Sequence, residues 1–294
     1  MRVPTDALKQ FLGTWGEVRA ASSQPVAVAL IAPHGRPGIR WQAALDPGLD
    51  HPGTLRFVEP GRLLPEADVA IVLWPEGPWD EAAADRLALT LATCVPRLVL
   101  LPHGNEIDLA VATRRAARIA EVAQADVIVG QDPGPAAEAV AAAMGRLVPD
   151  HVVALARQFT LLRRPLAWQE VAATAKQNAV VGALPLPGAD MPLMTANQAK
   201  MVLRMAAMHD LPLDLNRARE LLAVLGASLG WRTAARQLAK FVPGPGWVVG
   251  AGMGYSGTLA VGKLALTWFQ QQAPVRRLSV GPLEAVVDDG MPGA

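Results

Sequence analysis

The chain has 294 residues, of which 51% are hydrophobic and 18% are charged, and its net charge is +1. This length suggests two domains with a sizeable core, and the balanced charge gives no indication of a nucleic-acid partner. The only cysteine, Cys94, excludes an intramolecular disulfide and a zinc site built from thiolates, which fits a reducing cytoplasm. Residues 1–20 carry scattered charges and no apolar run, so they do not resemble a secretory signal.

The first half of the chain alternates between helix and strand patterns. A short amphipathic helix is predicted near the N-terminus through Leu8, Phe11, Leu12 and Trp15. Apolar runs with strand character lie at 25–32, 54–61, 67–75, 96–102 and 125–130. Helical patterns lie between or after them at 80–94, 108–124 and 134–148. Uniformly apolar strands that alternate with helices predict an α/β fold with a parallel sheet, whose ligand edge lies at the carboxyl ends of the strands.

In the second half, helical periodicity replaces the strand pattern from about residue 154. One helix face is formed by residues spaced four and three apart, namely Met194, Gln198, Met201, Met205 and Met208. Methionine commonly fills gaps in helix cores, so this stripe predicts a core face in which the amide of Gln198 needs hydrogen-bond partners. The predicted organisation is an α/β domain over 1–153, an all-helical domain over 154–275 and a flexible tail over 276–294.

The order of elements in the first half resembles the G domain of Era-like small bacterial GTPases, which implies a P-loop NTPase-like fold. The phosphate-binding G-x-x-x-x-G-K-[ST] loop would follow the first strand, where the chain reads PHGRPGIR. With the second glycine aligned on Gly38, the first glycine, the lysine and the hydroxyl residue become Pro33, Ile39 and Arg40. The aspartate of D-x-x-G aligns with Val58. We therefore expect a GTPase-like domain without the groups that bind phosphate and magnesium.

The base-reading N-K-x-D motif of such GTPases aligns with HGNEID, which follows the strand at 96–102. Asn105 and Asp108 keep the spacing of the motif, whereas Glu106 replaces its lysine. Two interpretations stay open. In one, Asn105 and Asp108 retain guanine-nucleotide binding; in the other, Asp108 is simply the N-cap of the helix that follows.

The most specific stretch of the second half is ALPLPGADMPLMTANQAKMVLRMA, residues 183–206. It resembles the YcjF-like domain of unknown function that is found in bacterial membrane proteins and behind Era-type GTPase domains. The positions that match the family pattern include Pro185, Pro187, Gly188, Asp190 and Gln198, with Arg232 and Arg236 further along the chain. The resemblance spans roughly residues 165–270. It implies a helical domain, a GTPase-like partner domain and membrane association.

The charged residues of this pattern each have two interpretations. Asp190 is either a helix cap or a partner for Arg232 or Arg236. Arg232, Arg236 and Lys240 recur every four residues and form a basic stripe. This stripe is either a solvated helix face or a contact with anionic lipid head groups.

A further stretch, WVVGAGMGYSG at 247–257, matches the G-x-G-x-x-G fingerprint of a dinucleotide-binding turn. Prolines precede it and no acidic residue ends a second strand about 20 residues on, so the fingerprint lacks its context. The run 241–262 is free of charge and lies between Lys240 and Lys263. Three interpretations follow: a helical bundle with glycine-mediated packing, a membrane-embedded hairpin, and, last, a dinucleotide site.

The sequence as a whole predicts a non-catalytic scaffold or regulatory protein on the cytoplasmic side of the bacterial inner membrane. We expect the helical domain to contact the membrane, and we expect no catalytic residues, no cofactor, no metal and no nucleic-acid partner. A homo-oligomer is compatible with the pattern. The alternative prediction is a divergent guanine-nucleotide-binding switch that uses Asn105 and Asp108.

Overall fold

The computed structural model describes residues 5–33, 35–46, 54–74, 81–92, 95–102, 109–184, 190–211 and 246–272. Side chains are described from residue 13 onward within these ranges, except at 81, 109–110, 190–192, 246–249 and 272. The tail predicted at 276–294 lies outside the described residues.

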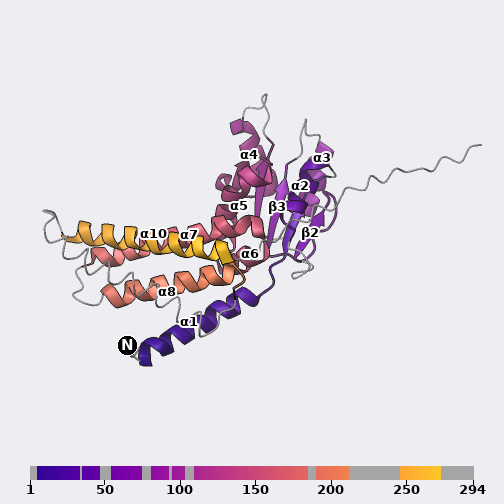
Figure 1. Ribbon diagram of the computed structural model, residues 1–294. Coiled ribbons are helices and arrows are strands. Elements are labelled where there is room, and N and C mark those ends of the chain that lie inside the picture. Colours follow the sequence, from indigo (N-terminus) through magenta and orange to yellow (C-terminus); the bar gives the residue numbers. More distant parts are fainter. Residues whose placement is uncertain are drawn as a thin grey trace, which may run out of the picture.

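The centre of the first half is a five-stranded sheet in which every pairing is parallel. Its strands are β1 (Val28–Ile31), β2 (Leu55–Val58), β3 (Val69–Leu73), β4 (Arg97–Leu101) and β5 (Val127–Val129), in the order β2-β1-β3-β4-β5. In β1, β3 and β4 nearly every residue is buried, because helices cover both faces of the sheet (Figure 1). The predicted α/β fold with a parallel sheet is therefore confirmed.

Two helices cover each face of the sheet. Helices α2 (Arg36–Ala44) and α5 (Pro133–Leu147) pack on one face, and α3 (Glu81–Thr90) and α4 (Leu109–Ala120) pack on the other. Short 3-10 helices at Gln124–Asp126 and Pro149–His151 precede β5 and follow α5. Helix α2 is an addition to the predicted elements, because its sequence RPGIRWQAA contains Pro37 and Gly38. Proline is favourable in the first turn of a helix, and the buried Trp41 anchors this helix to the sheet.

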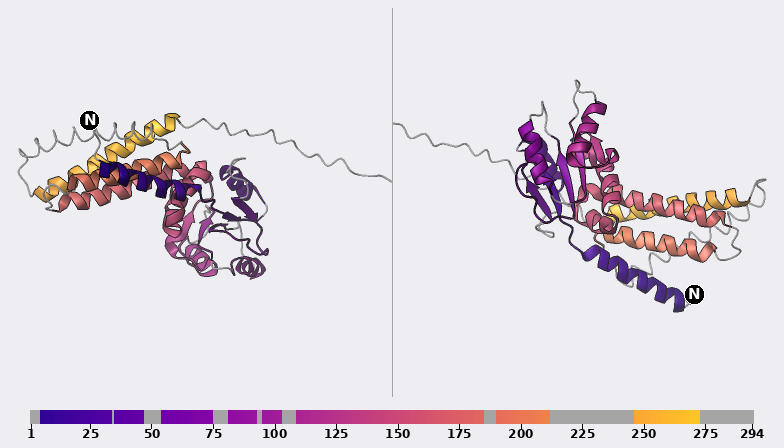
Figure 2. Two further views of the ribbon diagram at one scale, coloured as in Figure 1. Left: turned by 90° about the horizontal axis from the view of Figure 1, so that it is seen from below. Right: turned by 180° about the vertical axis from the view of Figure 1, so that it is seen from behind.

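The helices of the second half project from the sheet as an arm (Figures 1 and 2). After the short α6 (Val152–Gln158), the arm consists of α7 (Thr160–Ala183), α8 (Asp190–Met208) and α10 (Gly246–Gln272). The N-terminal helix α1 (Thr5–Ser23) lies against α6 and α8, so a helix is present where the sequence predicts one. No described helix alone has the length and apolarity to cross a bilayer. Taken together, Pro133–Leu147 and Pro149–Gln158 have the length and composition of a membrane span, but a bend of 116° separates them.

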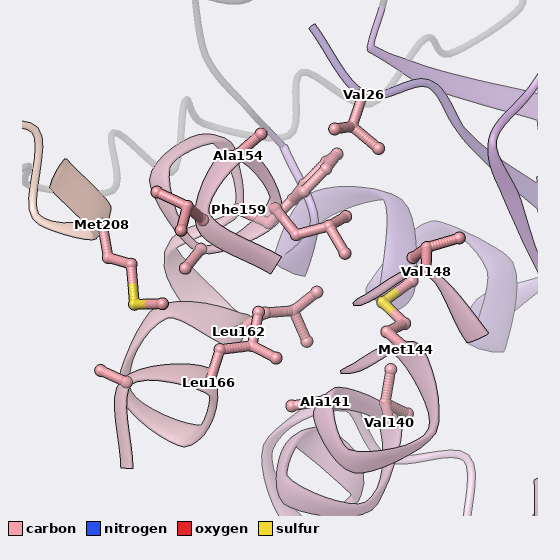
Figure 3. Packing of buried hydrophobic residues seen from close by; sticks show 14 of the residues in the cluster. Val26, Val140, Ala141, Met144, Val148, Ala154, Phe159, Leu162, Leu166 and Met208 are labelled. Atoms are coloured by element: carbon pink, nitrogen blue, oxygen red, sulfur yellow. The ribbon is translucent and has the colours of Figure 1, made fainter. Parts of the chain in front are cut away.

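One apolar cluster passes from the sheet into the arm. It includes Leu30 and Ile71 of the sheet, Phe159 at the α6–α7 junction, and Met201 and Phe269 of the arm. Figure 3 shows the junction, where Phe159, Leu162 and Leu166 lie between Met208 on one side and Met144 on the other. The methionines of the predicted stripe, Met194, Met201, Met205 and Met208, are between 0% and 5% exposed. Their interpretation as a core face is confirmed.

Hydrogen bonds reinforce this junction at the base of the arm. The buried amide of Gln158 accepts a bond from the amide of Val26 at 3.2 Å and donates to the carbonyl of Gln24 at 3.1 Å. Arg157 donates to Asp210 Oδ1 at 2.8 Å and to the carbonyl of Ser22 at 3.0 Å. The end of α1, the start of β1 and the end of α8 are therefore held to the same short helix, α6.

Helices α7 and α10 run antiparallel with their backbones in close contact at glycines. Added Cβ atoms on Gly182 and Gly250 would each overlap the other glycine's carbonyl oxygen. A Cβ on Gly254 would likewise overlap the carbonyl oxygen of Asn178. The glycines at 252, 254 and 257 lie inside α10 rather than in a strand-to-helix turn, so the dinucleotide-turn interpretation is wrong. The close-packing interpretation accounts for Gly250 and Gly254.

We expect Gly250→Ala to lower the free energy of unfolding by about 1–3 kcal/mol, because the new methyl group separates two tightly packed helices. The matched control is Gly252→Ala in the same helix, where nothing lies within 4 Å of an added Cβ. That control should be neutral or stabilising by up to about 1 kcal/mol, since alanine favours the helix. Urea denaturation of both variants measures the difference. Equal effects of the two substitutions would contradict the glycine contact.

Candidate functional site

The strand order places a topological switch point between β1 and β3. In such sheets, ligands bind outside the carboxyl ends of the strands at this point. The sequence places the phosphate loop of a GTPase here, directly after β1. The residues that follow β1 therefore show whether the chain forms an anion-binding loop.

A helix occupies the position of the phosphate loop. Helix α2 begins at Arg36, so Gly38 lies in its first turn rather than in a loop. A Cβ on Gly38 would lie 3.2 Å from Ala32 Cβ and 3.2 Å from Phe57 Cε2, so this glycine permits close packing of α2. The side chain of Ile39, at the lysine position, is 64% exposed on this helix. The second glycine and the lysine position of the aligned motif therefore lie within α2 and not in a loop before it.

The other positions that align with GTPase motifs make contacts within the protein. Arg40, at the position of the hydroxyl ligand, forms an exposed ion pair with Asp132, with Nη2 2.5 Å from Oδ1. Val58, at the position of the metal-side aspartate, is only 5% exposed at the end of β2. The amide of Gly61 donates to the buried hydroxyl of Thr90 at 2.8 Å, which ties the loop after β2 to α3.

The chain's own side chains cover the described part of the edge beyond β3, β4 and β5. Gln131 follows β5, and its Nε2 donates to the carbonyl of Leu100 at 2.9 Å and to the carbonyl of Trp74. The indole Nε1 of the fully buried Trp41 donates to the carbonyl of Gln131 at 2.6 Å. The carbonyl oxygens of Trp74, Leu100 and Gln131 are thus paired within the protein.

Most of the predicted site residues lie outside the described residues. These are Asn105, Asp108, Pro185, Pro187, Gly188, Arg232 and Arg236. Asp190 is the first residue of α8, but its side chain is not described. Gln198 is described, and its surroundings form the second candidate site.

Gln198 belongs to a polar layer inside the arm, which we define as Asn178, Asn197, Gln198 and Thr258. Gln198, Asn178 and Thr258 are at most 1% exposed. The hydroxyl of Thr258 accepts bonds from Gln198 Nε2 and Asn178 Nδ2, both at 2.9 Å, and donates to the carbonyl of Gly254 at 2.7 Å. Asn197 Nδ2 completes the layer by donating to Asn178 Oδ1 at 2.9 Å. The expected partners of Gln198 are therefore Thr258 and, through it, Asn178.

The polar layer joins α7, α8 and α10, but its chemistry is that of a structural element. Its members are amides and one hydroxyl, and the Thr258 hydroxyl has no histidine or carboxylate as a hydrogen-bond partner within the described contacts. Within the described ranges, no group of three His, Cys, Asp or Glu residues is placed to hold a metal ion. Buried hydrogen-bonded groups of this kind fix the register of packed helices. The sequence signal for Asn178 is an amide within an otherwise apolar helical pattern.

The one described histidine with a perturbed pKa lies at the base of the arm. Burial lowers the pKa of His209 below its usual 6.5, and nearby Arg163 adds to this effect, while the hydrogen bond with the Met205 carbonyl opposes it. The Nδ1 atom lies 2.8 Å from that carbonyl, and the ring packs against Phe269. His209 is thus a neutral part of the core at pH 7.

Comparisons of this chain with protein-family models, with curated proteins and with solved structures find no match. The resemblances to the YcjF-like domain and to Era-like GTPases stay predictions from the sequence.

We expect Thr258→Val to lower the free energy of unfolding by about 1–3 kcal/mol, since it removes the acceptor of the buried Gln198 amide, while Asn178 Nδ2 keeps its bond to the Met194 carbonyl at 3.3 Å. The matched control is Thr267→Val in the same helix. Thr267 is exposed and makes the same kind of bond to the carbonyl four residues back, at 2.9 Å. Its substitution should change stability by less than about 0.5 kcal/mol. Thermal unfolding with equal losses for the two variants would contradict the role of the layer.

We expect Gln131→Leu to destabilise the protein by about 1–2 kcal/mol, because the Trp74 carbonyl loses its side-chain donor at the sheet edge. Gln42→Leu on α2 is the control, since Gln42 is exposed. Denaturant midpoints measure both variants. A Gln131 variant as stable as the wild type would show that the edge does not depend on this amide.

Proposed function

We propose that this protein is a non-catalytic, GTPase-like scaffold or regulatory protein that associates with the bacterial inner membrane through its helical arm. The observation that carries the non-catalytic part is the start of α2 at Arg36, in the position of the phosphate loop. Phosphoryl transfer depends on positioned cations and donors around the γ-phosphate. Here the aligned positions hold an exposed isoleucine, an ion-paired arginine and a buried valine.

The membrane part of the proposal is supported by the end of the arm farthest from the sheet. Large apolar side chains are exposed there, on Val180 (64%), Leu184 (50%) and Leu193 (48%). Grouped exposed apolar side chains favour association with another surface over contact with water. In this proposal the sheet half presents a folded surface to proteins while the arm contacts lipid.

Isothermal titration of the full chain with GTP, GDP and ATP in the presence of magnesium tests the non-catalytic part. We expect no heat of binding, because the phosphate-binding groups are missing. Micromolar, magnesium-dependent binding would overturn the proposal. In that case Asp108→Ala would distinguish the alternative switch, which requires this aspartate for guanine recognition, from binding elsewhere.

A further inference from the structure

Among the residues that the structure describes, the far part of the arm is almost free of charge. We define the distal arm as residues 177–183 of α7, 190–199 of α8 and 246–262 of α10. It contains no lysine, arginine or glutamate, and Asp190 at its extreme end is its only residue with an ionised side chain at neutral pH. Its exposed apolar side chains include Val180 and Leu193.

A lysine on each of these helices marks where the distal arm begins. We call Lys176, Lys200 and Lys263 the lysine belt. All three are exposed, and none makes an ion pair with another described residue. The helices α7, α8 and α10 pack against one another, so the three lysines belong to one bundle.

The pairings between the helices show how far apart the three lysines lie along the arm. Gly182 lies opposite Gly250 and Val171 opposite Gly262, so Lys263 lies about one residue below the level of Val171. The ion pair between Glu170 and Arg204, at 2.9 Å, places Lys200 slightly below the level of Lys176. With a rise of 1.5 Å per residue, the three lysines lie within about 9 Å of one another along the arm.

An aromatic residue lies close to the level of Lys176. Tyr255 follows Gly254, which contacts Asn178, whereas Lys263 lies eight residues further along α10, about 12 Å closer to the sheet. The Tyr255 side chain is 39% exposed. Tyrosine and lysine together are typical of the boundary between lipid head groups and hydrocarbon, where the ring stays at the interface and the ammonium group reaches the phosphates.

We propose that the lysine belt binds the phosphates of anionic phospholipids when the distal arm contacts a membrane. This inference rests on the proposed membrane association and specifies its lipid class.

Flotation of the full chain with lipid vesicles tests the lipid class. We expect binding to phosphatidylcholine vesicles that contain phosphatidylglycerol to exceed binding to pure phosphatidylcholine on the order of 100-fold, about fivefold for each lysine near an anionic surface. A variant with Lys176→Gln, Lys200→Gln and Lys263→Gln should lose this preference. The matched control carries Arg114→Gln, Arg115→Gln and Arg118→Gln on α4, which removes the same charge from an exposed face of the sheet half and should keep the preference.

The outcomes separate the inference from the proposed function. Equal binding to both kinds of vesicle, or equal loss of preference in the two triple variants, overturns the inference and leaves membrane association intact. Binding to neither kind of vesicle overturns the membrane part of the proposed function as well.

A fluorescent label tests whether the distal arm reaches the hydrocarbon of the membrane. Cys94 is the only cysteine, so Cys94→Ser combined with Val180→Cys gives one labelling site on the distal arm. We expect lipids with quenchers in their acyl chains to quench the label in vesicle-bound protein. A label at Ile39→Cys in the same background, on the exposed face of α2, should stay unquenched. An unquenched label at position 180 in bound protein overturns the inference.

Discussion

The structure depends on a single apolar core that is shared by one face of the sheet and by the helical arm. Phe159 is central to it, because this fully buried residue interrupts the helix and redirects the chain from α6 into α7. Burying a side chain of this size contributes about 1.5–3 kcal/mol, and its neighbours from α5 and α8 depend on the same contact.

Within the arm, two kinds of contact act together. Gly250 and Gly254 bring α10 so close to α7 that the backbones touch, and Thr258, one turn further along, meets the amides of Asn178 and Gln198. Close backbones leave little room for adjustment, and the amides find acceptors in only one register. Together, the glycine contacts and the polar layer fix the register of α10 along α7. Apolar contacts alone would allow more than one register.

The regular elements of the sheet could be predicted from the sequence, because strands such as 69–73 are buried on both faces and read as continuous apolar runs. Helix α2 could not be predicted, since Pro37 and Gly38 are typical of a turn and only the burial of Trp41 outweighs that local preference. The hydrogen-bond partner of Gln198 could not be predicted either, because Thr258 is 60 residues away and contacts it only through tertiary packing. The hydrogen bonds of Gln131 to the carbonyls of Trp74 and Leu100 also join residues that are far apart in the sequence, so no local pattern encodes them.

The shared core has a mechanical consequence. Domains joined by a flexible linker sample many relative orientations. Here α6 and α7 leave the sheet without a linker, and their side chains belong to the same cluster as those of β1 and β3. The arm and the sheet are therefore expected to move as one body. When the end of the arm contacts a surface, that contact also sets the orientation of the sheet and its height above the surface.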